Sequence, residues 1–431
     1  MEYSPIYKKQ AIILPSLLLF VSVCSSVHAI DLIELNDREL SNVNGQALMS
    51  LGYIAPNDSV NKMQGQGVGF YKLGIEAELE LNANIKKLQL GCGGVNGAGG
   101  CDIDIDNLSL SGVADTREGR VSSSAKLTNP FLEFAIKNPN AASTREIVGL
   151  RLSAEKALGM LTTGTENSVT PNGINSLSGY MKIKDTTGTG YTAGRNMTYA
   201  DTKQSIDGNV KTSFLFIPLT LGFKSTDYNL ALDSAKADIF INGTTISGRR
   251  LSSAKLDGYA NINQLNFGGQ LGASLNITAG LLTLQKQVTG NITGLKANIT
   301  IEENLGFIHK IPLDNPFSLS LQSQNVWWPG AAETAQKGWW MAFEDTIDIG
   351  SVVPSKKIDI TNDVLKQVVG PISTYITNNP VACELFDCIG GSGLAVGNVN
   401  LPNTSVNFPL KDLQLATQDF APNCYGSLKF C

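Results

Sequence analysis

The chain has 431 residues and a formal net charge of −5, with 42% hydrophobic residues, only 16% charged residues and 43 glycines. This combination argues against a disordered chain, and the scarcity of charge argues against coiled coils and helical bundles. The negative balance argues against nucleic-acid binding through phosphate contacts. Only two histidines, His28 and His309, are present. So few histidines leave little for acid–base catalysis or metal binding, and we therefore predict no enzyme and no cofactor.

The first 29 residues have the layout of a secretory signal peptide. Lys8 and Lys9 precede an apolar run over residues 11–23, and a small-x-Ala cleavage site ends at Ala29. The run is too short for a membrane-spanning helix. We therefore expect export to the periplasm, outer membrane or cell surface of a Gram-negative bacterium. Cleavage would also remove His28 and leave His309, whose alternating surroundings are typical of a packed strand residue.

Six cysteines remain after removal of the signal peptide. They fall into three pairs that are close in sequence, which favours three local disulfides in an oxidising compartment, although the connectivity stays open. A metal site is disfavoured, because there is no CxxC spacing and no nearby His. The expected disulfides join Cys92 to Cys101, Cys383 to Cys388 and Cys424 to Cys431.

A hairpin is predicted around the first cysteine pair. Apolar residues alternate with polar ones on both sides of the Gly-rich loop 91–100, which is the period of a strand with one buried face. The alternation reverses at Lys87 on one side and at Asp106 on the other, so we expect a bulge or a sharp twist there. The pairs expected to face each other are Leu90 with Ile103, Leu88 with Ile105, Ile85 with Leu108, and Ala83 with Leu110.

Three alternate carboxylates in this hairpin, Asp102, Asp104 and Asp106, form a weak calcium candidate. An EF-hand loop requires a Gly at its sixth position and a distal Glu, and both are absent. The expected register places Asp106 opposite Lys87 and Asp104 opposite Gln89. We therefore interpret the three residues as a polar strand face and expect no metal.

The remaining pattern predicts a mainly β fold, a large curled or sandwiched antiparallel sheet with one C-terminal amphipathic helix. Residues 237–247 are expected to form a hairpin around Asn242-Gly243. The helix is capped by Thr361 or Asn362 and covers one end of the sheet, and Gly370-Pro371 should kink or split it. We expect a signal peptide (1–29), an N-terminal segment (30–60), a β-rich domain (61–350, with two sheets dividing near 200–225 as one option) and a helix with a disulfide-stapled tail (351–431).

All four tryptophans lie in one stretch, as Trp327-Trp328 and Trp339-Trp340. Neighbouring residues on a strand point to opposite faces, so each pair should place one ring in the core and one outside. The outer rings could form an ordinary cross-strand pair, or an interaction patch for a sugar or a protein partner. Both interpretations stay open from the sequence.

Two segments resemble a family of exported bacterial proteins. Residues 35–47 contain Leu40-Ser-Asn-Val-Asn-Gly-Gln46, which is similar to the L-S-x-V-x-G-Q opening of FilA-type pilus-assembly proteins. The Asn-Pro-Phe strand at residues 129–135 and the strand at residues 145–152 resemble the same group. The resemblance covers about 35 residues and implies a surface or fimbria-associated role, with no catalytic residues to transfer.

Together these features predict an exported structural or interaction protein for the assembly or display of a pilus or fimbria. Its expected partners are other surface or pilus proteins, through edge-strand or aromatic contacts, with outer-membrane association as a further option. The alternative is a periplasmic or outer-membrane-associated β protein that binds lipid or glycan inside a curled sheet.

Overall fold

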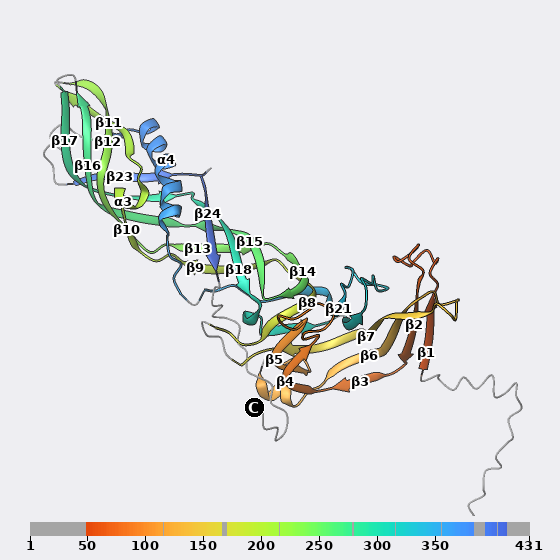
Figure 1. The fold of residues 1–431 in the computed structure, drawn as a ribbon. Helices are drawn as coiled ribbons and strands as arrows, with labels where there is room; N and C mark the ends of the chain where they lie inside the picture. Colours follow the sequence, from red (N-terminus) through yellow and green to blue (C-terminus); the bar gives the residue numbers. More distant parts are fainter. Residues whose placement is uncertain are drawn as a thin grey trace, which may run out of the picture. The chain divides into compact units, whose positions relative to one another are not determined.

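Long β-strands in three sheets build the chain (Figure 1), with 62% strand and 8% helix. The computed structural model describes residues 49–411 except 115, 166–169, 215, 278–279, 315, 355, 383–392 and 403. The predicted signal peptide, the Leu40–Gln46 motif and the cysteine pairs 383/388 and 424/431 lie outside the described residues. The expectation of a mainly β fold with a helix near the C-terminus is confirmed.

The largest sheet has 12 strands, most of them from the first half of the chain. Its main order is β1-β2-β6-β7-β20-β21-β8-β5-β4, with β3, β14 and β19 paired at its sides. The strands are β1 (Met49–Ile54), β2 (Val68–Ile75), β3 (Glu78–Leu81), β4 (Ala83–Leu90), β5 (Ile103–Ser111), β6 (Ala125–Lys137), β7 (Glu146–Thr162), β8 (Ile174–Ile183), β14 (Thr244–Leu251), β19 (Lys310–Leu313), β20 (Phe317–Gln322) and β21 (Gly338–Ile347).

Part of this sheet closes on itself. Strand β5 pairs with β8 and also with β7, so the pairings β7–β20–β21–β8–β5–β7 form a ring of five strands. The interior of the ring is an apolar cluster that includes Ile103, Leu161, Leu177, Met341 and Phe343. Beyond the ring, β6, β2 and β1 continue the sheet from β7 without closing it. The sheet is therefore curled at one side and open at the other.

Two smaller sheets follow in the chain. The seven-stranded sheet contains β10 (Arg195–Thr198), β11 (Ile206–Phe214), β12 (Ile217–Leu232), β16 (Gln264–Ile277), β17 (Gly280–Thr293), β22 (Val381–Ala382) and β23 (Gly393–Asn400). The five-stranded sheet contains β9 (Thr186–Tyr191), β13 (Lys236–Ile241), β15 (Ser253–Ile262), β18 (Lys296–Asn304) and β24 (Ser405–Lys411). The chain leaves the first sheet between β8 and β9, and residues 200–225 contain no sheet boundary, because β11 pairs with β12.

The hairpin predicted around the first cysteine pair is confirmed. Strand β4 pairs with β5 in the expected register from Ala83–Leu110 to Leu90–Ile103, and a disulfide joins Cys92 to Cys101. The register runs through the reversal of the apolar pattern without a shift. Asn107 has a φ of 49° at that point, and this left-handed residue accounts for the change of face.

The hairpin expected at Asn242-Gly243 is wrong. Strand β13 pairs with β9 and β15, whereas β14 pairs with β8 in the largest sheet. The Asn-Gly dipeptide is instead the point where the chain passes between two sheets. Asn242 N donates to Asp257 O at 2.9 Å, and Gly243 N donates to Asp185 Oδ1. These partners from distant parts of the sequence accept the backbone N–H hydrogen bonds of the dipeptide and replace the ladder of a local hairpin.

The C-terminal helix is α4 (Asn362–Asn378), capped by the Thr361 side chain, which accepts from Val364 N at 3.4 Å. It continues through Pro371 as one helix and is not split. Its apolar stripe, including Leu365, Val369 and Ile376, packs into the core of the two smaller sheets. The other helices in the described part of the chain are α2 (Arg117–Val121), α3 (Tyr199–Thr202) and the 3-10 helix η1 (Leu305–Phe307).

Removal of the confirmed disulfide should destabilise the fold measurably. Cys92 and Cys101 are nine residues apart, so the Cys92→Ser/Cys101→Ser double variant should lose about 2–3 kcal/mol of unfolding free energy through the gain in loop entropy. Urea denaturation monitored by circular dichroism measures this loss. Double substitution is preferable to a reductant, because a reductant would also act on the other cysteines. An unchanged midpoint would contradict the expectation.

Candidate interaction surface

One face of the open part of the largest sheet consists of apolar side chains. Directly paired residues of antiparallel strands point to the same side of a sheet. The registers of the strands therefore define two apolar rows that cross β1, β2, β6, β7, β20 and β21. One row is Tyr53, Tyr71, Phe134, Leu150, Leu321 and Trp339. The other is Leu51, Leu73, Leu132, Leu152, Leu319 and Met341.

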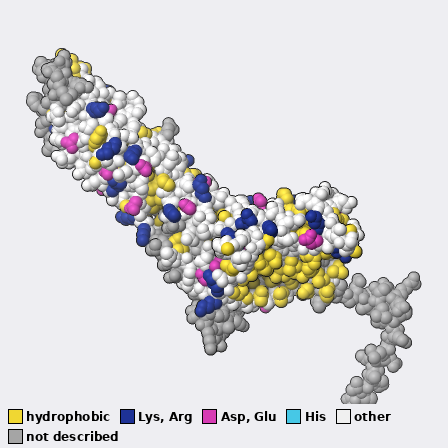
Figure 2. Space-filling model, in the orientation of Figure 1, with side chains coloured by type: hydrophobic (Ala, Val, Ile, Leu, Met, Phe, Trp, Pro, Cys, Tyr) yellow, Lys and Arg dark blue, Asp and Glu magenta, His cyan; other side chains and the backbone are white. Residues whose placement is uncertain are grey.

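We call this surface the apolar face. It comprises the two rows, except for the buried Met341, together with four residues that continue them along the strands, Met49, Ile75, Ile136 and Ile147. No member of this set is charged. Leu51 is 85% exposed, Ile147 61% and Leu152 57%. Figure 2 shows a broad hydrophobic area over the part of the sheet that holds β1, β2, β6 and β7.

The opposite side of the same strands carries the charges. Lys72, Glu133, Arg151 and Ser320 occupy one cross-strand row there. Arg151 Nε donates to Glu133 Oε2 at 2.8 Å, and its Nη2 donates to Pro329 O at 2.9 Å. Glu133 is only 3% exposed and Arg151 6%. The burial of Glu133 raises the pKa of its carboxyl, while the charge and hydrogen bonds of Arg151 act in the opposite direction.

A segment after β20 covers this charged row. Trp328, which is 2% exposed, contacts Phe70 with a ring-centroid distance of 5.7 Å and lies 5.3 Å from the Arg151 guanidinium. These contacts build a core on the charged side of the sheet. The usual arrangement, with apolar residues covered and charges exposed, is therefore inverted in this part of the sheet.

The apolar face continues into the interior of the five-stranded ring. Leu319 and Trp339 lie on the face and pack against the ring core, and Met341 in the same row is buried inside it. The open strands β1, β2 and β6 therefore extend the inner surface of a curled sheet. The largest apolar patch on a typical monomer covers about 300–600 Å² and often has a function. An uncharged face six strands wide is in this sense the main candidate for a binding surface.

The four tryptophans do not share one exposed patch. Trp328 and Trp340 are both 2% exposed, while Trp327 and Trp339 are half-buried. Trp327 packs on the charged side of the sheet, with Lys62 Nζ 4.2 Å from its ring centroid. Trp339 belongs to the apolar face. The two partly exposed rings, Trp327 and Trp339, therefore lie on opposite sides of the sheet. Between the two pairs, Val326 and Ala335 form a single bridge in place of a hairpin.

The three carboxylates of the weak calcium candidate are not brought together. Asp102 is 1% exposed and accepts from Arg250 Nε at 3.0 Å and from Trp339 N at 3.1 Å. Asp104 and Asp106 bind Lys87 Nζ at 2.5 and 3.0 Å. Burial raises the pKa of Asp104, but hydrogen bonds from Lys87, Gln89 and Asn175 outweigh it and hold that pKa below its usual value.

The single histidine expected in the mature chain is a core residue. His309 is fully buried, and its Nδ1 lies 2.8 Å from Thr163 O. Burial lowers its pKa, and the hydrogen bond to Thr163 opposes this effect. Across the described part of the chain, no group of three or more His, Cys, Asp or Glu side chains is placed to hold a metal ion.

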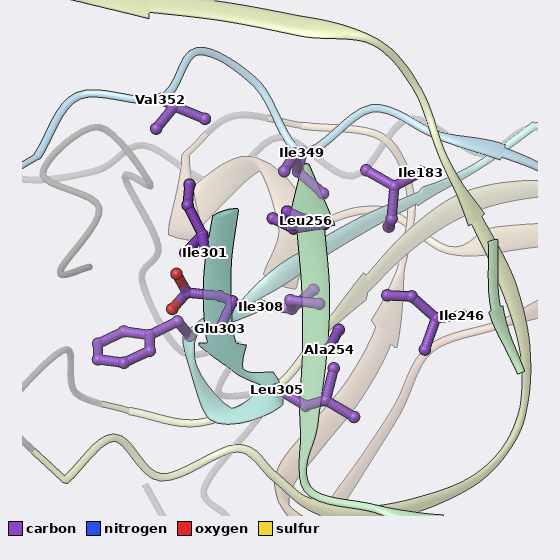
Figure 3. A pocket seen from close by; sticks show the side chains of 11 residues that line it. Ile183, Ile246, Ala254, Leu256, Ile301, Glu303, Leu305, Ile308, Ile349 and Val352 are labelled. Carbon is purple, nitrogen blue, oxygen red and sulfur yellow. The ribbon is translucent and has the colours of Figure 1, made fainter. Parts of the chain in front are cut away.

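Two internal cavities are small. The first has a volume of about 20 Å³ and is lined by apolar side chains such as Leu256, Ile301 and Val352, with the Glu303 carboxyl among them (Figure 3). The second lies beneath α4, has a volume of about 40 Å³ and is lined by residues such as Met197 and Leu365. Cavities of this size hold one or a few water molecules, not a lipid or a sugar.

No family model, curated protein or solved structure matches the chain. Within the described ranges, none of the helices combines the length and the apolar composition needed to cross a membrane.

Substitution of Arg151 tests the inverted arrangement. Arg151→Met should lower the free energy of unfolding by about 3–5 kcal/mol at neutral pH, because it leaves the buried Glu133 carboxylate without its ionic partner. The loss of Arg151 also removes a contribution that lowers the Glu133 pKa. A carboxyl with a raised folded pKa stabilises the fold below its unfolded pKa, and this contribution is lost as the pH rises through the folded value.

The deficit of Arg151→Met should therefore be larger at pH 8 than at pH 5, as measured by urea denaturation at both values. The double variant Glu133→Gln/Arg151→Met is the matched control, and it should recover part of the stability at pH 8. Equal deficits at the two pH values would show that the charge of Glu133 does not matter.

Proposed function

We propose that the chain is an exported structural protein that assembles with other subunits through the apolar face, in the construction or display of a bacterial surface appendage. The observation that carries the proposal is an uncharged sheet face six strands wide that is open to solvent on residues such as Leu51 and Leu152. Export rests on the signal-like N-terminus, and the appendage rests on the resemblance to FilA-type proteins.

The occupant that we assign to the apolar face is a second copy of the chain. Six strands spaced about 4.8 Å apart, with up to three outward residues each, give a face of roughly 25 by 20 Å. Two such faces packed together would remove on the order of 1,000 Å² of surface from water, which is the lower end of the range for a specific association. An interface between identical faces is self-complementary under a twofold axis, and two sheets pack readily at about 10 Å.

A specific observation also favours the lipid-binding alternative. The apolar face is continuous with the interior of the curled ring, through Leu319 and Trp339. Acyl chains require an uncharged surface of this kind and make no demand on hydrogen bonding. Bound lipid would therefore be the outcome that replaces self-association.

A charge on the apolar face should abolish self-association. Leu152→Asp places a carboxylate at the centre of the face, where burial against a second copy would leave it unpaired. We expect the wild-type mature chain to sediment as a dimer or larger species at micromolar concentration, and Leu152→Asp to sediment as a monomer. Val113→Asp is the matched control, because Val113 is 60% exposed but lies outside the apolar face; it should leave the dimer intact.

Two outcomes would contradict this assignment. A wild-type chain that stays monomeric at all accessible concentrations would remove the second copy as the occupant. Lipid found by native mass spectrometry on the wild-type chain, and lost in Leu152→Asp, would establish the alternative. Photocrosslinking from position 51 in intact cells would then identify the partner in the envelope.

A further inference from the structure

A second exposed apolar surface lies at the end of the β11–β12 hairpin, in the seven-stranded sheet. The pairing of the two strands continues to Phe214 and Ile217 at the tip of the hairpin. Exposure rises toward this tip, from 9% at Val210 to 38% at Leu219, 61% at Ile217 and 100% at Phe216. The base of the hairpin packs against α4 and the core, to which Phe223 also belongs. The apolar surface therefore continues outward from the core to a bare tip.

The hairpin extends past its neighbours. Strand β22 ends at Ala382, which pairs with Lys211, three residues before the end of β11. Strands β16 and β17 end toward the same end of the sheet, where Ile277 pairs with Gly280, because Phe223 pairs with Leu275 and Leu275 pairs with Leu282. The sequence contains no charged residue from 258 to 285, so this second hairpin end is uncharged as well.

Phe216 is an unusual residue for its position. Its φ of 67° lies in the left-handed region, which two-residue hairpin turns normally fill with Gly, Asn or Asp. A bulky aromatic residue there is strained, and a fully exposed ring gains nothing from packing within the chain. The backbone conformation of the turn therefore disfavours Phe216, and packing within the chain does not stabilise its ring. A contact outside the chain would account for the presence of Phe at this position.

Lys211 is the one charged residue in the sequence from residue 208 to residue 223, and its side chain is exposed. Lys224 lies further from the tip and pairs with Asp207 at the base of the hairpin. The register pairs Lys211 with Thr220, which places Lys211 on the side of the hairpin opposite Ile217 and Leu219, because positions along a strand alternate in face. This is the layout of an amphipathic element with an apolar side for lipid and a basic group for anionic head groups, although the whole chain has a net charge of −5.

We propose that the β11–β12 tip inserts into the surface of a phospholipid bilayer that contains anionic lipid. Phe216, Ile217 and Leu219 enter the boundary between head groups and acyl chains, and Lys211 contacts lipid phosphate. The facing backbone groups of β11 and β12 pair with each other along the hairpin. The proposal stands on residues outside the apolar face and is independent of the proposed assembly.

Flotation of the mature chain with vesicles of phosphatidylethanolamine and phosphatidylglycerol tests this proposal. Phe216→Gly should weaken partitioning about tenfold or more through the loss of the aromatic side chain. Glycine also relieves the strained φ, so this variant should fold at least as stably as wild type. The variant Lys211→Gln should weaken binding about fivefold on anionic vesicles only. Leu152→Gln, which alters the apolar face, is the matched control and should float like wild type.

Depth provides a second readout. A Phe216→Trp variant should show additional fluorescence quenching by brominated lipid compared with wild type, whose tryptophans all lie at residues 327–340. The proposal is overturned if wild type does not float with any vesicle, if Phe216→Gly floats as well as wild type, or if only Leu152→Gln loses binding. Circular dichroism shows whether a variant that no longer floats has unfolded. Phe216→Gly is chosen because it should remain folded.

Discussion

The buried ion pair between Glu133 and Arg151 is the constraint on which the open part of the large sheet depends. Two charges can leave water only when they face each other with further hydrogen bonds, and the pair obtains these from direct contact and from Pro329 O. Successive residues on a strand point to opposite sides, so this pair places Leu132, Phe134, Leu150 and Leu152 on the other side. The apolar face therefore consists of the residues that lie on the side of the sheet opposite the ion pair.

The two exposed apolar surfaces belong to different sheets. The large sheet curls around an apolar core at one side and presents the same inner surface, uncovered, at the other. The seven-stranded sheet is supported by α4 and ends in a hairpin tip with Phe216 fully exposed. Both surfaces cost free energy in water, and in each case the strands beneath have enough paired backbone and buried core to hold the surface in place.

Local patterns predicted the elements whose partners are close in sequence. The register of β4 with β5 was predictable because the apolar reversals at Lys87 and Asp106 coincide and one disulfide closes the loop. The helix α4 was predictable from its cap at Thr361 and its stripe of aliphatic residues. The turn at Asn242-Gly243 was not, because its flanking strands find partners in β9, β15 and β8, and such long-range pairing leaves no local signal.

The sequence by itself determined that the chain is a β protein poor in charge, with alternating strands and only two histidines. Only the tertiary structure decided which side of each strand is covered. In the segment 130–137 the alternation suggests that Glu133 faces water, yet Glu133 is 3% exposed and Leu152, in the cross-strand row of Leu132, is 57% exposed. A period of two separates two faces but does not say which one receives a cover, because the cover here comes from residues almost 200 positions further along the chain, around Trp328.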